Sequence, residues 1–174
     1  MAETIQESIN FELRETSGAI KDLSNVLTAH VQSSDGASSW PKVTLPNFEA
    51  FVEHIRMRSK SDIVLFSPVV DPLEVTAWNT YSVRNQGWIQ EGYDHIGESD
   101  ANIKPIPSKI YRGRGNGTAD DLCTGDYPCA PVWQMSPPPE RSSLVNKNIL
   151  SHPESMGMFD TLNNTRDIVL GLAN

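Results

Sequence analysis

Residues 75–92, VTAWNTYSVRNQGWIQEG, hold two tryptophans ten residues apart with a tyrosine between them. Apolar and aromatic side chains recur here every three or four residues, which is the spacing of one face of a helix. The spacing predicts a helix that packs Trp78, Tyr81 and Trp88 against the strand expected just before it. The alternative, an active site, would need an acid, a base or a nucleophile beside a pocket, and only two acidic residues lie near the end of the segment.

Residues 62–70, DIVLFSPVV, form a run of β-branched and apolar residues that is typical of a strand buried on both faces. Pro68 lacks an N–H group, so it favours an edge position or a bulge near the end of the strand. Before this strand, residues 46–58 place Phe48 and Phe51 on one face at helical spacing. We therefore expect a short helix with both phenylalanines in the core.

A long helix is predicted for the first thirty residues, where apolar side chains again recur every three or four positions. The members of this seam are Ile5, Ile9, Leu13, Thr16, Ile20, Leu23, Leu27 and His30 or Val31. Because the seam is narrow, it favours either a dimer stalk or a helix that flanks the domain.

After residue 92 the chain becomes rich in turn residues and holds only short strand candidates. These are KIYR (109–112), APVWQMS (130–136) and SLVNKNIL (143–150). Residues 158–174 then close the chain with helical spacing. Helices followed by antiparallel strands and a final helix are the order of an α+β fold.

The composition is that of a folded, acidic chain. A length of 174 residues with 38% hydrophobic residues fits one domain with a sizeable core. The net charge of −8 argues against a nucleic-acid partner, which needs a cationic face. No stretch reaches the ~18–20 apolar residues of a membrane span, and the first ten residues lack the apolar core of a signal peptide. We therefore expect a soluble chain.

Two cysteines, Cys123 and Cys129, bracket the turn-rich loop CTGDYPC. Their spacing fits neither a redox CxxC motif nor a structural zinc site. Two alternatives stay open: a local disulfide, which would indicate an oxidising compartment, or two unpaired buried thiols. Asn116 and Asn163 match the acceptor pattern for N-glycosylation.

The rest of the sequence offers no catalytic or metal-binding pattern. The histidines, His30, His54, His95 and His152, are scattered without the spacing of metal ligands. Neither a nucleophile elbow nor a zinc-protease motif is present. We predict no catalytic residue, no metal and no cofactor, and we expect binding rather than catalysis.

Several motifs taken together resemble a known family. WPKVTLPNFEAFVEHIR, SDIVLFSPVV, AWNTYSVRNQGWIQEG, APVWQMSPPP and SLVNKNILSHPE occur in this order. In this order they resemble the extracellular sensory region of receptor-type nucleotide cyclases from diatoms and related algae, which is similar to the CHASE family of ligand-sensing domains. The resemblance spans roughly residues 23–159, but the Gly-Leu-Asp of the typical CHASE pattern is missing, so no known CHASE ligand is carried over.

The resemblance implies a PAS-like antiparallel sheet with a long N-terminal helix and flanking helices. It implies a stalk helix over residues 1–33, a sensor domain over 34–160 and an exit helix over 161–174. It also implies the extracellular face of a membrane receptor, with membrane segments and the cyclase outside this chain. The resemblance also leads us to expect a homodimer, in which a second copy of the chain binds through the N-terminal helix.

A PAS-like sheet would offer a cavity on its concave face. The strand residues best able to line it are Tyr111, Trp133, Gln134, Asn146 and Asn148, which suit a small polar or heterocyclic ligand. Neighbouring strand residues point to opposite faces, so at most one of Trp133 and Gln134 can line the cavity. The alternative is that Trp133 is core and the amides face solvent.

The leading hypothesis is therefore an extracellular signal-input domain that binds a small ligand and relays binding through its end helices. A second hypothesis is a ligand-free dimerisation module that uses the seam of residues 5–31. A small stand-alone enzyme ranks last.

Overall fold

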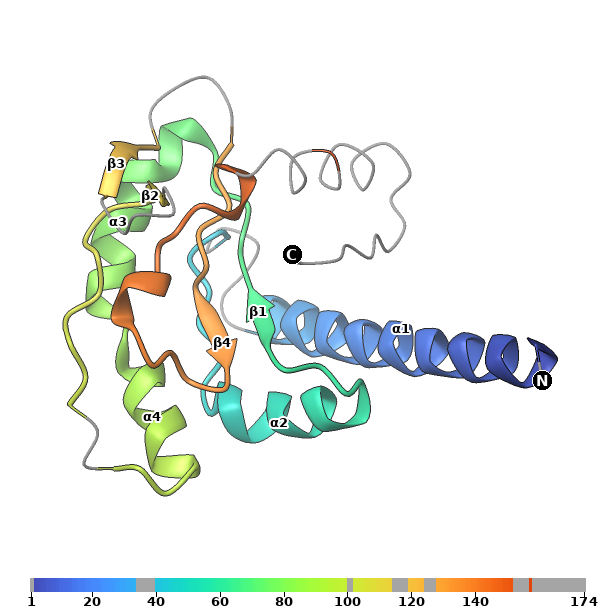
Figure 1. Cartoon of the computed structure of the whole chain (residues 1–174). Coiled ribbons are helices and arrows are strands. Elements are labelled where there is room, and N and C mark those ends of the chain that lie inside the picture. Colours follow the sequence, from blue (N-terminus) through green and yellow to red (C-terminus); the bar gives the residue numbers. More distant parts are fainter. Residues whose placement is uncertain are drawn as a thin grey trace. The chain divides into compact units, whose positions relative to one another are not determined.

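The computed structural model describes residues 2–33, 40–99, 102–113, 119–123, 128–151 and 157. Helices and short strands build an α+β fold, as the sequence predicts (Figure 1). The chain forms two compact units. Unit 1 takes Met1–Leu65, Gly87–Ile103 and Gln134–Pro139, and unit 2 takes Phe66–Gln86, Lys104–Trp133 and Glu140–Asn174. Each unit draws on several stretches, whereas the predicted ranges 1–33, 34–160 and 161–174 follow one another; those ranges stay a prediction.

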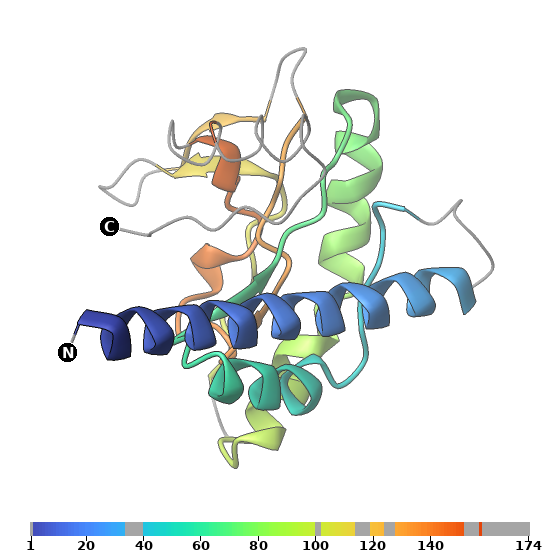
Figure 2. The same cartoon turned by 90° about the vertical axis from the view of Figure 1, so that its right-hand side faces the viewer.

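Unit 1 contains one long helix, α1 (Ala2–Ser33), in the range where the seam predicts it. Figures 1 and 2 both show α1 beside α2 (Phe48–Arg58), and Leu23 of the predicted seam is buried. Two other seam residues are not: Leu13 is 47% and Ile20 38% exposed. The face of α1 that packs in unit 1 carries Ala19 and Leu23. This face is therefore rotated about the helix axis away from Leu13 and Ile20 of the predicted seam.

An ion-pair cluster fixes this helix pair. Arg58, in the last turn of α2, lies 3.3 Å from a carboxyl oxygen of Glu15 and 3.2 Å from one of Asp22. Its guanidinium Nη2 would also lie 3.2 Å from a Cβ added at Gly18. A Cβ at position 18 would therefore require the Arg58 guanidinium to shift by a few tenths of an ångström.

The helix α2 buries Phe48, Val52 and Ile55, which recur at helical spacing. Phe48 was predicted to be core and is confirmed as buried. The same prediction for Phe51 is wrong, since this side chain is 37% exposed. It lies on the flank of α2, roughly 90° from the middle of the buried face, as its position on a 3.6-residue turn requires.

The segment 75–92 is not one helix but two, α3 (Val75–Arg84) and α4 (Gly87–His95). Asn85 ends α3: its backbone has left the helical region, and both its main-chain N–H and its side-chain Nδ2 donate to Tyr81 O, at 3.1 and 2.8 Å. A short asparagine side chain competes in this way with the helical hydrogen bonds. Leu73 lies in a preceding turn, η2 (Pro72–Glu74), and is 93% exposed.

The strand predicted for 62–70 is shorter than expected. Only β1 (Val64–Phe66) forms, and it pairs with β4 (Gln134–Ser136). Pro68 lies two residues after the end of β1 and has no N–H to continue the ladder. Val70 pairs separately with Cys129 through backbone bonds of 2.7 and 2.9 Å.

Unit 2 holds the second described sheet, in which β2 (Tyr111–Gly113) is antiparallel to β3 (Ala119–Leu122). The predicted strand 143–150 is reduced to two isolated bridges, of Lys147 with Tyr111 and of Asn148 with Pro131, between two 3-10 helices, η3 (Ser142–Leu144) and η4 (Ile149–Ser151). Asn146 has φ +64° there, a left-handed conformation that interrupts any strand.

Some predictions fall outside the described residues. These are the helix of residues 158–174 and the two glycosylation candidates, Asn116 and Asn163. Within the described ranges, no helix combines the length and the apolar character that crossing a membrane requires.

Candidate functional site

Three aromatic rings form the core of unit 2. Trp78 and Trp133 meet nearly edge to face, with ring centroids 5.4 Å apart and planes at 78°. Tyr81 completes the group at 5.7 Å from Trp78 and 5.8 Å from Trp133. Trp78 is confirmed as a core residue, and Trp133 is fully buried with it. The side of α3 that carries Trp78 and Tyr81 therefore packs against Trp133.

Asn146 joins this core to the surrounding loops. Its Oδ1 accepts from Trp78 Nε1 at 3.0 Å, and its Nδ2 donates to Ser82 Oγ at 3.0 Å and to Pro107 O at 2.7 Å. Both amide hydrogens are thus used inside the protein, and the residue is fully buried. In this arrangement Asn146 holds α3 against two loops.

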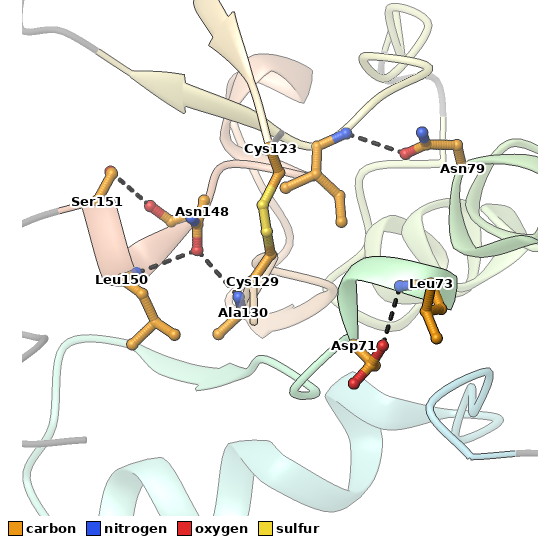
Figure 3. The surroundings of a disulfide bond; sticks show 10 residues. Asp71, Leu73, Asn79, Cys123, Cys129, Ala130, Asn148, Leu150 and Ser151 are labelled. Atoms are coloured by element: carbon orange, nitrogen blue, oxygen red, sulfur yellow. Dashed lines mark hydrogen bonds between the residues drawn. A yellow bond between two sulfur atoms is a disulfide. The ribbon is translucent and has the colours of Figure 1, made fainter. Parts of the chain in front are cut away.

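The other predicted ligand residues also make internal contacts. Asn148 Oδ1 accepts from Ala130 N at 2.9 Å and from Leu150 N at 3.2 Å (Figure 3). Tyr111 is half-buried, and this burial raises the pKa of its phenol. Gln134 is buried in unit 1, where its amide pairs with both backbone groups of Leu45, at 2.8 and 2.9 Å.

The structure therefore places the predicted ligand residues in two groups. Tyr111, Trp133, Asn146 and Asn148 belong to unit 2, whereas Gln134 belongs to unit 1. None of the five lines either of the two cavities described below. A ligand-binding role for them stays a prediction.

The two cysteines of the described chain, Cys123 and Cys129, form a disulfide with their Cα atoms 6.5 Å apart (Figure 3). Of the two alternatives left open by the sequence, the local disulfide is the one found. Cys129 is buried and paired with Val70, so the bond ties the loop after β3 to the core of unit 2. A disulfide is compatible with an extracellular location, because such bonds persist in oxidising compartments.

A cavity of about 610 Å³ lies in unit 2 beside this disulfide. Its volume falls within the ~300–1,000 Å³ typical of small-molecule sites. One wall is the outer side of α3, where residues four apart form two adjacent rows. The lining residues are Val75, Thr76, Asn79, Thr80, Val83 and Arg84 of α3, with Ser108, Lys109, Ile110 and Cys123 opposite.

Asn79 fixes the two walls to each other. Its Oδ1 accepts from the main-chain N–H of Ile110 at 3.0 Å, and Figure 3 shows this bond beside the disulfide. The Nδ2 group of Asn79 makes no hydrogen bond to any described residue. Because Oδ1 is held, Nδ2 is an oriented donor at the wall of the cavity.

The electrostatic character of this cavity is cationic. Arg84 and Lys109 are both exposed, and no described residue forms an ion pair with either. Among the described residues of the lining, none carries an acidic side chain. This concentration of positive charge stands out in a chain whose net charge is −8.

Sequence reasoning missed this site. The row Thr76, Thr80 and Arg84 is visible in the segment 75–92 as polar residues four apart, which is the pattern of an ordinary solvated helix face. Only the facing segment around Lys109, distant along the chain, turns that face into the wall of a cavity.

A second cavity, of about 650 Å³, lies in unit 1 between the end of α1 and the start of α2. Its lining is mainly apolar: Val26, Ala29, His30, Ser33, Leu45, Pro46, Asn47, Ala50 and Phe51. The partial exposure of Phe51 is explained by this position.

Comparisons of the chain with protein-family models, with curated proteins and with solved structures find no match. The case for a function therefore rests on the motifs of the sequence and the geometry of the two units.

Proposed function

We propose that this chain is an extracellular ligand-sensing domain, a CHASE-like and PAS-like signal-input module of a membrane receptor. The observation that carries the proposal is the cavity of about 610 Å³ in unit 2, which combines apolar and polar walls beside a disulfide. The ordered motifs that resemble the sensory region of receptor-type nucleotide cyclases support it. We assign no catalytic step to the chain, and the cyclase would lie outside it.

The helix α3 is the element through which binding would act. One side of it lines the cavity, and the other side carries Trp78, which hydrogen-bonds Asn146. A ligand that favours one position of α3 would therefore bias the aromatic core and the loops held by Asn146. Its effect is limited to its difference in affinity for the two states, typically a few kcal/mol.

The test is a thermal-unfolding screen of the oxidised chain against a panel of small metabolites. A compound at a concentration of 100 Kd should stabilise the chain by about 2.7 kcal/mol. Thr80→Trp fills the cavity from an exposed position of α3, and Ala77→Trp adds the same ring at an exposed position outside the lining. We expect stabilisation to survive Ala77→Trp and to be lost in Thr80→Trp.

Two results would contradict the proposal: a folded chain that no compound stabilises, or stabilisation that Thr80→Trp leaves intact. The receptor context has its own test, which is sequencing of the transcript beyond the codon for Asn174. We expect an apolar segment of about 20 residues, the length that spans a bilayer.

A second candidate function, a dimerisation module, is favoured by the exposed apolar residues of α1. Leu13 and Ile20 lie seven residues apart on one face and remain exposed in the single chain. Sedimentation of the double variant Leu13→Glu, Ile20→Glu tests it, with Asn25→Glu as the control on the opposite face. A dimer that dissociates only in the double variant supports this function, and an unchanged sedimentation coefficient removes it.

A further inference from the structure

We infer that the cavity of unit 2 binds a small organic anion, a carboxylate carried on a short apolar body. The inference rests on the proposed sensing function and specifies the ligand class of the same cavity. Three features of the lining carry it: two cations that form no ion pair with a described residue, a set of hydrogen-bond donors and an apolar floor.

The cations are the first feature. Two arginines outside the cavity meet acidic partners: Arg58 pairs with Glu15 and Asp22, and Arg56 lies 3.6 Å from Glu49. No described carboxylate pairs with Arg84 or Lys109, and both line the same cavity, although acidic residues outnumber basic ones by 22 to 14 in the sequence. A guanidinium binds a carboxylate through two parallel hydrogen bonds, and an ammonium adds a point charge.

The donors are the second feature. Asn79 offers its Nδ2 hydrogens, since its Oδ1 is held by Ile110 N–H. Thr76 and Ser108 add hydroxyl groups to the lining, whereas the hydroxyl of Thr80 already donates to Thr76 O at 3.2 Å. The described lining residues offer donors and no acidic acceptor, a set that favours an anion over a cation or an amine.

The apolar floor is the third feature. Val75, Val83 and Ile110 line the same cavity, and Ile110 is itself buried. Their side chains can cover an aliphatic or aromatic group, and burial of that apolar surface favours binding. An inorganic anion would leave this surface uncovered, so the lining fits a carboxylate with an apolar body better than a free phosphate.

The experiment compares carboxylates with neutral amides of the same shape. Isothermal titration of the full oxidised chain would use benzoate against benzamide and hexanoate against hexanamide, at low and at high salt. The expected result is binding of the carboxylates at least about tenfold tighter than their amides, because a charge-assisted bond is lost in the amide. Added salt should weaken carboxylate binding, since both cations are exposed.

Matched variants locate the effect. Arg84→Gln and Lys109→Gln should each weaken benzoate binding about tenfold. Lys104→Gln removes an exposed cation of unit 2 that is outside the lining and should leave binding unchanged. All three positions are exposed, and circular dichroism with the melting temperature confirms that each variant is folded.

The outcomes separate the two proposals. If amides bind as tightly as carboxylates, or if Arg84→Gln and Lys109→Gln bind benzoate normally, the anion inference fails and the sensing function stands. The anion inference also fails, and the sensing function stands, if neither carboxylate–amide pair binds but another compound of the metabolite panel stabilises the chain through the cavity. If nothing in the panel or among the probes binds, both proposals fail.

Discussion

The helices α3 and α4 follow each other in the sequence and each buries a tryptophan, but the buried polar groups near them differ in kind. Trp78 of α3 donates to Asn146, a neutral amide whose two hydrogens are both bonded. In unit 1, α4 brings Gly92 close to Glu49, whose carboxyl group is buried. One unit thus buries a satisfied amide and the other an acid.

Few polar contacts stabilise the buried carboxyl group of Glu49. Glu49 is 3% exposed, and neither of its carboxyl oxygens makes a well-formed hydrogen bond within the described chain. Burial raises the pKa of this carboxyl; the Ser136 hydroxyl, the Arg56 guanidinium and His95 lower it, Glu53 raises it, and burial has the largest effect. We conclude that unit 2 is held by a network indifferent to ordinary changes of pH, whereas unit 1 carries a titratable group in its core.

The largest effect is expected for Trp78→Ala. The change removes a fully buried ring, its contacts with Trp133 and a hydrogen bond to Asn146, and should lower the free energy of unfolding by about 3–5 kcal/mol. Urea denaturation measures it. Trp40→Ala, at a partly exposed position, is the control, and an equally small loss in both variants would show that the aromatic core is not what stabilises unit 2.

The second effect concerns Asn146. Asn146→Ala should lower the free energy of unfolding by about 2–4 kcal/mol, because it leaves Trp78 Nε1 and Pro107 O without their partner. It also requires alanine to keep φ +64°, a left-handed conformation that alanine adopts less readily than asparagine. Asn146→Gly loses the same hydrogen bonds without the backbone cost and should be about 1 kcal/mol less damaging. A glycine variant as stable as the wild type would contradict the role of the amide network.

The third effect concerns Gly92 in α4. A Cβ added there would lie 3.1 Å from Pro138 Cβ, closer than ordinary packing allows, so Gly92→Ala should cost about 1–2 kcal/mol. Gly87→Ala is the matched control in the same helix, since nothing lies within 4 Å of its added Cβ and alanine has the higher helix propensity. Thermal unfolding of both variants measures the difference, and equal melting temperatures would rule out the close approach.

The smallest effect is the pH dependence of Glu49→Gln. Because the folded-state pKa of Glu49 is raised above its usual 4.5, the folded chain loses stability as the pH rises from the usual value through the raised one. Glutamine removes this loss, so the variant should be more stable by about 1 kcal/mol at pH 7 and equal to the wild type at pH 4.

Urea denaturation across this pH range measures the crossover. Glu140→Gln, at an exposed position, should leave the difference near zero at both pH values. A Glu49→Gln variant that is less stable at pH 7 would mean that the ion pair with Arg56 outweighs the cost of burial.

Periodicity predicted what depends on local spacing. The helices, the burial of Trp78 and Trp88 and the α+β class follow from apolar residues three and four apart. Periodicity did not reveal the break at Asn85, because the seam continues across it while the asparagine side chain takes Tyr81 O. Nor did it identify Phe51 as exposed, because Phe51 lies on the flank of α2 and spacing alone does not show how far the buried face extends.

The spacing of residues along the chain could not predict the candidate site. Its walls come from α3 and from residues 108–110, and one hydrogen bond from Ile110 N–H to Asn79 joins them. The disulfide was predictable as one of two alternatives, from two cysteines at the ends of a short loop. Its position beside a cationic cavity required the fold.

The central claim, that unit 2 is the sensing unit, is tested most directly by methyl NMR of the oxidised chain during titration with benzoate. We predict saturable shifts for the methyl groups of Val75, Val83 and Ile110, which line the cavity beside the disulfide, and none for Val26 and Leu45, which line the cavity of unit 1. Shifts confined to Val26 and Leu45 would contradict the claim. The absence of a saturable shift in either set would contradict the anion inference alone, and the titration would then use a compound that stabilises the chain in the metabolite panel.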